Sequence, residues 1–191
     1  MQTKSFLKKT WHFIWHDDSW ASWLVNLVLA FILVKFVIYP IIGLMLSTSY
    51  PVVAVVSSSM HHSDSDFNTW WDANKDYYLA KNIDKEEFEK FPFHNGFNKG
   101  DIMVLKGRQP KDIKVGDILI YQSSLANPII HRVTQIEQAN NKYIFTAKGD
   151  NNIAQDPKPV TEEQIKKTGV AIFKIPFLGY IKIWFNQLTG L

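Results

Sequence analysis

The chain contains no cysteine among its 191 residues. This absence excludes disulfide bonds, thiolate zinc sites and a cysteine nucleophile, although it does not identify the redox compartment. Arginine is also scarce, with only Arg108 and Arg132, and the net charge of +3 comes from scattered lysines. Because these scattered charges form no basic stripe that could follow a phosphate backbone, nucleic acid is not an expected partner.

Charge is almost absent from residues 20–46. At 1.5 Å per residue a helix of this length reaches about 40 Å, enough to cross a bilayer core of roughly 30 Å. A cleaved secretory signal is the alternative, because the small residues Ser47 and Ser49 follow the run. Signal peptides have apolar cores of only about 7 to 15 residues, so the length favours an uncleaved transmembrane helix.

Positive charges are distributed unequally around this span. Lysines occur before it, but no lysine or arginine follows it until Lys75. The positive-inside bias therefore predicts a cytoplasmic N-terminus at residues 1–19 and an extracytoplasmic domain at residues 47–191. The membrane is expected to be the cell membrane, or the endoplasmic-reticulum membrane in a eukaryote.

Two features of the span fit this topology. Lys35 lies inside it and is expected to snorkel towards the interface through its flexible side chain. Aromatic residues near the cytoplasmic boundary form an interfacial belt, or a few of them are buried in a short helix before the span. These residues are Trp11, Trp15, Trp20 and Trp23.

Short runs rich in Val, Ile, Tyr and Phe, separated by Gly-Asp turns, predict a mostly β domain after the span. With the transmembrane helix, this gives a mostly β fold with an N-terminal anchor and a few short helices. Short helices are expected at residues 84–91 and 161–167. The expected strands cover residues 52–56, 102–106, 117–121, 129–136, 143–147 and 169–174.

The first of these strands runs directly into a cluster of serines, Ser57-Ser58-Ser59. A serine hydroxyl is a weak nucleophile until a base takes its proton, and neutral imidazole suits that task near neutral pH. Of the six histidines, His131 interrupts a clear strand pattern. A lone histidine on a strand is more often structural than catalytic. The hypothesis that His131 is the base therefore depends on the other motifs in the chain.

Three motifs occur in a specific order behind the predicted membrane anchor. They are Ser57-Ser58-Ser59-Met60, Ile130-His131-Arg132-Val133, and Lys148-Gly-Asp150-Asn-Asn followed by Asp156. Together they resemble the archaeal and endoplasmic-reticulum branch of the type I signal peptidases. The resemblance implies an anchored β domain and covers nearly the whole chain except an insertion.

By motif position, the resemblance implies that Ser59 is the nucleophile and His131 its general base and later general acid. Asp156 would orient and charge-balance the imidazole. The oxyanion would be held by the backbone N–H of Ser59 and by the hydroxyl of Ser57. Because His131 occupies the position of the bacterial lysine base, the motifs favour a Ser-His mechanism over a Ser-Lys one.

The role of Asp150 stays open at this stage. It is a possible alternative or auxiliary member of the triad. It can also stabilise the Gly-Asp-Asn-Asn turn and pair with Arg132 or Lys148, which we favour. Gln155 replaces an acid found in many family members, so Asp156 is the remaining local carboxylate.

An aromatic and acidic insertion at about 62–96 departs from the family pattern, and the proline expected after Ser-Met is missing. The insertion could pack on the domain as a lid that shapes the cleft, contact the membrane surface, or dock another protein. We favour packing. The start of the insertion also offers histidines and carboxylates, which suit zinc or a harder divalent ion, but adjacent histidines on a loop are weak signals of a metal site. The residues concerned are His61, His62, Asp64 and Asp66. We predict no metal and no cofactor.

Apolar residues recur at helical spacing near the C-terminus. This segment is too short and polar to span a membrane. It would lie in the bilayer interface or cover one end of the sheet, and we favour the second placement. The residues are Phe177, Tyr180, Ile181, Trp184, Phe185 and Leu188.

The resemblance implies a membrane-bound serine endopeptidase that removes signal peptides from exported preproteins after small residues. The extended substrate would pair with a strand edge. The expected substrate-contacting residues are Val52, Val53, Ala54, Val55, Val56 and Met60. Expected partners are signal peptides, the lipid bilayer, and a secretion translocon or accessory subunits. Two alternatives are a non-catalytic membrane-anchored binding module and a self-cleaving regulatory serine peptidase.

Overall fold

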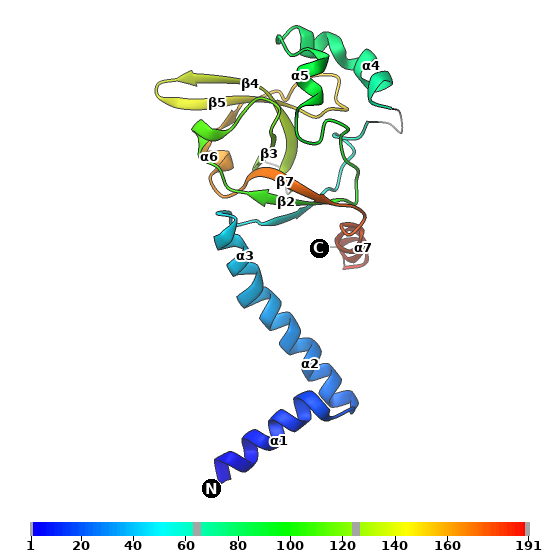
Figure 1. Ribbon diagram of the computed structural model, residues 1–191, viewed down its shortest axis with the longest axis vertical. Coiled ribbons are helices and arrows are strands. Elements are labelled where there is room, and N and C mark those ends of the chain that lie inside the picture. Colours follow the sequence, from blue (N-terminus) through cyan, green and yellow to red (C-terminus); the bar gives the residue numbers. More distant parts are fainter. Residues whose placement is uncertain (1, 63–65, 124–126, 190–191) are drawn as a thin grey trace. The chain divides into compact units, whose positions relative to one another are not determined.

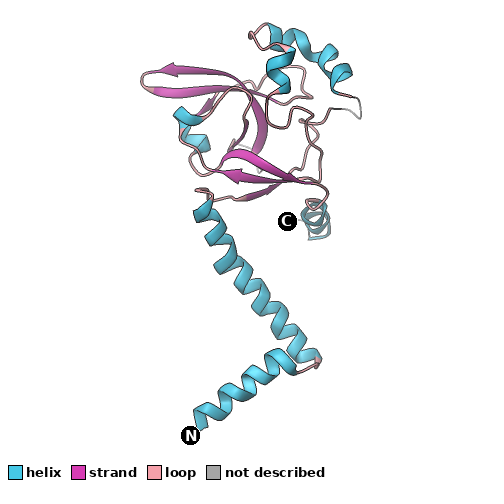
Figure 2. Ribbon diagram, viewed as in Figure 1, coloured by secondary structure: helices cyan, strands magenta, loops and turns pink. Residues whose placement is uncertain are grey.

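The computed structural model describes residues 2–62, 66–123 and 127–189. The chain divides into two compact units, Met1–Met45 and Leu46–Leu191. Figure 2 shows that the first unit consists of helices joined by a short loop and that the described strands lie in the second unit.

The N-terminal unit begins with α1 (Gln2–His16) and continues, after a bend, into a long apolar helix. That helix comprises α2 (Trp20–Leu33), a π-helical turn (Val34–Ile38) and α3 (Tyr39–Met45). Within the described residues, Trp20–Met45 is the one helix long and apolar enough to cross a membrane.

Polar contacts fix the bend between α1 and α2. Ser19 caps α2 by accepting a hydrogen bond from Ser22 N–H (3.2 Å), and Ser22 Oγ donates to the Phe13 carbonyl (2.5 Å). Asn26 Nδ2 donates to the Ile14 carbonyl (2.9 Å). The tryptophans expected near the boundary lie on these helices with their side chains exposed, so the alternative that some are buried is wrong. They are Trp11, Trp15, Trp20 and Trp23.

The second unit is built on an antiparallel sheet that curls on itself (Figure 1). In the described part of the chain the sheet has seven strands in the order β1-β2-β7-β3-β4-β5-β6. The strands are β1 (Val52–Ala54), β2 (Ile102–Lys106), β3 (Ile118–Tyr121), β4 (Ile129–Ala139), β5 (Lys142–Lys148), β6 (Val160–Thr161) and β7 (Gly169–Ile175).

The central strand β3 is buried on both faces because its alternate residues enter two different cores. Leu119 and Tyr121 join one cluster, whereas Ile118 and Ile120 join the other. Strand β4 pairs with β3 so that His131 lies opposite Leu119. His131 therefore stands on one of the best-packed parts of the sheet.

Two helices of the insertion, α4 (Phe67–Leu79) and α5 (Lys85–Glu89), form what we call the aromatic cap, residues 66–96. Asp66 starts α4 by accepting hydrogen bonds from the backbone N–H groups of Asn68 and Thr69. Figure 1 shows both helices together at one end of the domain. Buried aromatic and aliphatic side chains hold them there: Trp70, Trp71, Tyr78, Ile83 and Phe88.

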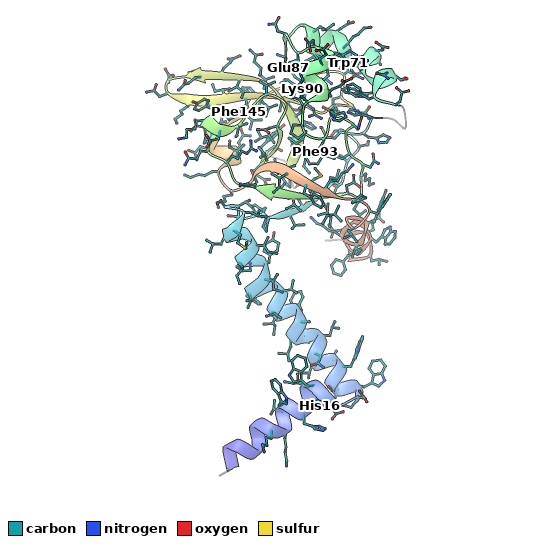
Figure 3. All side chains as sticks on the ribbon, in the orientation of Figure 1. His16, Trp71, Glu87, Lys90, Phe93 and Phe145 are labelled. Atoms are coloured by element: carbon teal, nitrogen blue, oxygen red, sulfur yellow. The ribbon has the colours of Figure 1, made fainter. Side chains whose placement is uncertain are left out.

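The cap is a separate core rather than an extension of the sheet core. Figure 3 shows Trp71 among the cap helices, while Phe145 lies on the strands. The ends of the insertion meet, because Phe97 N–H donates to the Met60 carbonyl (3.0 Å). Tyr77 and Tyr78 of the cap hydrogen-bond Thr134 and Asp150, so the cap packs against the domain, while its role as a lid that shapes the cleft stays a prediction.

The mostly β fold with a few short helices and an N-terminal apolar helix is confirmed. The prediction that a strand reaches Val56 was wrong, because β1 ends at Ala54. Past Ala54, Val55 still hydrogen-bonds the neighbouring segment, because its N–H donates to the Asp101 carbonyl (2.8 Å), but no strand is formed at Val55 or Val56. Helix α4 and strand β6 were not predicted, and the final helix, α7, covers Tyr180–Thr189.

The C-terminal apolar stripe does not cover the sheet, contrary to the preferred placement. Tyr180 is half-buried over Gly100. The other members of the stripe are exposed or partly exposed, with Phe177, Ile181, Trp184, Phe185 and Leu188 among the exposed large apolar side chains of the domain. Tyr180, together with the backbone hydrogen bonds of Phe177 and Gly179 to Asp101 and Gly100, anchors the start of α7, while most of the apolar stripe stays exposed.

We predict that Phe88→Ala destabilises the domain by about 3–5 kcal/mol, because it removes the fully buried ring at the centre of the cap. Phe173→Ala, at a ring that is 60% exposed, is the matched control. Denaturant unfolding of the full chain in detergent, followed by tryptophan fluorescence, measures both. Equal stabilities for the two variants would contradict the cap's role as a packed core.

Candidate active site

The serine cluster forms a turn directly after β1. Ser57 and Ser58 are exposed and Ser59 is half-buried. The hydroxyls of Ser57 and Ser59 lie 3.2 Å apart and form a hydrogen bond. Two hydroxyl groups are thus presented side by side at the surface of the domain.

The loop after β5 clamps this turn. Asn151 N–H donates to the Ser59 carbonyl (2.8 Å), and Asn151 Nδ2 donates to the Ser58 carbonyl (3.2 Å). Asp150 N–H contacts the sulfur of Met60 (3.4 Å), whose side chain is buried. The Gly-Asp-Asn-Asn motif therefore fixes the backbone on which Ser59 stands.

Gly149 lets the serine turn, the loop and the histidine strand approach one another. A Cβ atom at Gly149 would lie 2.8 Å from the Ser59 carbonyl oxygen and 2.9 Å from His131 Nε2. It would also lie 2.7 Å from Asn152 Nδ2. Glycine is required here because of this close approach. The same contacts bring Nε2 of His131 next to Ser59.

The other ring nitrogen of His131 faces Asp156. His131 Nδ1 lies 2.9 Å and 2.8 Å from the two carboxylate oxygens, and the side chains are only 8% and 12% exposed. With a carboxylate as acceptor, Nδ1 is the donor, which leaves Nε2 of the neutral ring as an acceptor. The Asp156 carboxylate also accepts a hydrogen bond from the Tyr121 hydroxyl.

This arrangement supplies the parts of nucleophilic catalysis. A carboxylate orients an imidazole, and the free nitrogen of that imidazole faces the backbone of a serine. In the structure the Ser59 hydroxyl hydrogen-bonds Ser57, and catalysis would require it to contact His131 Nε2 as well. Catalytic hydrogen bonds are often looser in the absence of substrate.

Asp150 is held in a different environment, among buried groups. Its carboxylate accepts hydrogen bonds from Arg132 Nε (2.9 Å) and Nη2 (2.7 Å), and both side chains are fully buried. His62 Nε2 lies 3.0 Å from Oδ2, and the Tyr78 hydroxyl donates to Oδ1 (3.3 Å). Asp150 therefore pairs with Arg132 and two side chains of the insertion, and it is Asp156 that contacts His131.

Charge keeps Asp150 ionised despite its burial. Burial alone raises the pKa of this carboxyl, but Arg132 and the hydrogen bond from His62 lower it more, to about 2. Lys148, also buried, donates to the carbonyls of Gly149 (3.1 Å) and Asp150 (3.4 Å). Burial lowers the pKa of Lys148, and its ammonium lies over the rings of Tyr77 and Tyr78.

The predicted substrate-contacting residues are unequally accessible. Val52 and Val56 are exposed and Val53 is half-buried. Strand β1 lies at one end of the strand order and pairs only with β2 among the described strands, so its other edge is unpaired in the sheet. By contrast, Ala54, Val55 and Met60 are buried, and Val55 and Met60 belong to a core cluster, so their side chains are not open to a substrate.

The residues weighed as a metal site have other contacts. His61 Nδ1 lies 2.5 Å from Asn98 Oδ1, His62 bonds Asp150, and Asp66 caps α4. Asp64 lies outside the described residues. Within residues 2–62, 66–123 and 127–189, no group of three or more His, Asp or Glu side chains is placed to hold a metal ion.

Two site contacts were missed by sequence reasoning. Tyr121 ends a predicted strand, but nothing in the sequence indicates that its hydroxyl meets Asp156. Tyr77 donates to Gln155 Oε1 (3.1 Å) and hydrogen bonds Thr134 Oγ1 (2.9 Å), joining the insertion to the loop before Asp156. The helical spacing of Phe67, Trp70 and Trp71 was the available signal for α4.

We predict that Asp150→Asn destabilises the domain by about 3–5 kcal/mol, because it leaves the buried Arg132 charge uncompensated. The carboxyl has a pKa of about 2 when folded and an ordinary value of 3.8. The ionised Asp150 carboxylate therefore contributes roughly 2 kcal/mol to the free energy of unfolding. This contribution is fully present above the ordinary pKa of the carboxyl and is lost as the pH falls through the pKa of the folded state.

Denaturant unfolding at neutral pH and at about pH 2.5 tests both effects, with the exposed Asp72→Asn as control. On acidification, the wild type and the control should lose more stability than Asp150→Asn. Equal losses in all three proteins would contradict this role for Asp150.

Comparison with known proteins places these motifs in context. No family model matches the chain. It is 35% identical to the signal peptidase complex catalytic subunit SEC11 of Candida tropicalis over 98 residues, which cover 48% of this chain and 58% of that protein. It is 27% identical to SEC11 of Scheffersomyces stipitis over 159 residues, 80% of this chain and 75% of the relative.

A bacterial relative shares a shorter region. Signal peptidase I W of Bacillus subtilis is 30% identical over 71 residues, which cover 37% of each chain. The chain spans about half the length of the first curated relatives that it matches. The named relatives are signal peptidases, and they confirm the resemblance to the type I signal peptidase family that the three motifs carry.

Proposed function

We propose that this protein is a membrane-bound serine endopeptidase that removes signal peptides from exported preproteins after small residues. The observation that carries the proposal is the geometry around His131. Its Nδ1 contacts the Asp156 carboxylate, and its Nε2 lies close to Gly149, on the side where Gly149 also approaches the Ser59 carbonyl. The similarity to named signal peptidases supports the choice of substrate.

In the proposed mechanism, Ser59 Oγ attacks the carbonyl carbon of the scissile bond while His131 Nε2 takes its proton. The imidazolium then protonates the departing amine, and the acyl-enzyme forms. A water activated by the same nitrogen hydrolyses the ester and releases the cleaved leader. Asp156 keeps Nδ1 protonated and stabilises the imidazolium, so Nε2 remains the base.

The oxyanion of each tetrahedral intermediate is stabilised by the Ser59 backbone N–H and the Ser57 hydroxyl. The 3.2 Å contact between the Ser57 and Ser59 hydroxyls supports this assignment for Ser57, because it puts a donor beside the attacking oxygen. The extended substrate adds to the β1 edge near Val52 and Val53. Asp150 serves as a structural anchor of the loop rather than as a member of the triad.

The membrane is part of the proposed function. The helix Trp20–Met45 anchors the enzyme, with residues 1–19 in the cytoplasm and the peptidase domain outside, at the cell membrane or at the endoplasmic-reticulum membrane in a eukaryote. The exposed apolar side of α7 lies in the bilayer interface. Because SEC11 relatives are named as subunits of a complex, accessory subunits or a translocon are proposed partners.

We predict that Ser59→Ala and His131→Ala lower cleavage of a membrane-inserted preprotein by about 10⁴-fold or more, because each removes a member of a cooperative unit. The assay uses the full chain in detergent or liposomes, with sequencing of the new N-terminus. Ser58→Ala, at an exposed neighbouring hydroxyl, should cleave like the wild type.

Thermal unfolding of each variant shows that the domain is still folded. Full activity in Ser59→Ala would overturn the mechanism. Absence of cleavage by folded wild type, with and without added membrane extract, would favour the non-catalytic binding module. Cleavage confined to the enzyme's own chain would favour the self-cleaving peptidase.

We also predict that the cleavage rate rises with pH between about 5 and 8, because only neutral imidazole accepts the serine proton. Rates measured at substrate concentrations well below KM report the ionisation of groups in the free enzyme. As a control, an unrelated peptidase should cut the same preprotein at every pH of the series, which shows that the cleavage site stays accessible. A rate that stays constant or falls over this interval would argue against a histidine base.

A further inference from the structure

The Asp156 carboxylate lies in a loop with little regular structure. The strand before it ends at Lys148, and the next strand begins at Val160. Ile153, within this loop, is 100% exposed. The Asp156 backbone is held by its N–H bond to the Ala147 carbonyl (2.9 Å), which fixes the main chain but leaves the side-chain torsions free.

Tyr121 supplies the hydrogen bond that restricts those torsions. Its hydroxyl donates to Asp156 Oδ2, one of the two oxygens that face His131 Nδ1. The donor comes from the sheet, since Tyr121 lies on β3 and pairs with Ile129 of β4. A rigid strand thus holds a side chain that belongs to an irregular loop.

The tyrosine itself has little freedom. Its side chain is only 3% exposed and packs in the cluster that contains Leu119 and Val133. Burial raises the pKa of the Tyr121 hydroxyl, and the hydrogen bond to Asp156 raises it further, so the phenol stays protonated and remains a donor. The packed ring therefore presents a fixed donor to the carboxylate.

We propose that Tyr121 is a positioning residue that holds the Asp156 carboxylate towards His131 and so completes the chain Tyr121–Asp156–His131–Ser59. The proposal rests on the proposed peptidase function. Without the phenol, Asp156 can turn towards water, His131 Nδ1 loses its acceptor for part of the time, and the ring samples the tautomer that protonates Nε2. That tautomer cannot take the Ser59 proton.

The test is a double-mutant cycle on preprotein cleavage by the full chain. Tyr121→Phe keeps the packed ring and removes only the hydroxyl, and we expect kcat to fall about tenfold with KM nearly unchanged. If Tyr121 acts through Asp156, the same substitution should have no further effect in an Asp156→Ala background. A tenfold loss in both backgrounds would overturn the proposal, as would full activity of Tyr121→Phe.

Tyr143→Phe is the matched control, because Tyr143 is half-buried and packs against the same cluster. It should leave kcat unchanged. Unfolding temperatures of both Phe variants test whether the fold is retained. A tenfold loss in both Phe variants would indicate a general effect of the core and overturn the proposal.

A second readout does not depend on activity. Proton NMR of the full chain in detergent should show a low-field signal from His131 Nδ1–H, assigned by its loss in His131→Gln. We expect faster exchange of this proton with water in Tyr121→Phe than in the wild type and Tyr143→Phe. Equal exchange in all three would overturn the positioning role. Absence of peptidase activity together with faster exchange would refute the proposed function alone.

Discussion

The buried pair of Arg132 and Asp150 is the interaction on which the rest of the domain depends. Arg132 donates five hydrogen bonds: two go to Asp150 and three to the carbonyls of Pro92, Phe93 and Gly116. A guanidinium with no exposed surface is tolerated only when its charge and its donors are matched. One side chain on β4 therefore joins the end of the insertion, the turn before β3 and the loop after β5.

That pair also explains why two carboxylates six residues apart have different roles. Asp150 is fully buried, its charge is neutralised by Arg132, and its remaining hydrogen bonds go to His62 and Tyr78 rather than to His131. Asp156 lies at the edge of the core with a neutral donor, Tyr121, and an imidazole as partners. The carboxylate without a permanent cation is the one suited to stabilise a charge that appears only during a reaction.

The sequence was sufficient for the parts that local rules govern. Short runs rich in Val, Ile, Tyr and Phe predicted six of the seven strands that lie in the described residues, and the long apolar run predicted the helix Trp20–Met45. The short strand β6 was missed because two residues carry no periodicity. Motif spacing could not separate Asp150 from Asp156, because which acid meets His131 depends on how the loop folds over Gly149. The contact of Tyr121 with Asp156 is likewise a tertiary contact without a local signature.

The insertion is built into this arrangement rather than added to its surface. His62 stacks on Trp70 with ring centroids 3.8 Å apart and bonds Asp150, while the ring of Phe88 lies 4.8 Å from the Arg132 guanidinium. Removing the cap would expose both charges of the pair and would leave Lys148 without the rings that cover it. Because the loop that carries Asp150 also clamps Ser59, the insertion supports the serine turn through the buried pair, even though its helices do not carry Ser59, His131 or Asp156.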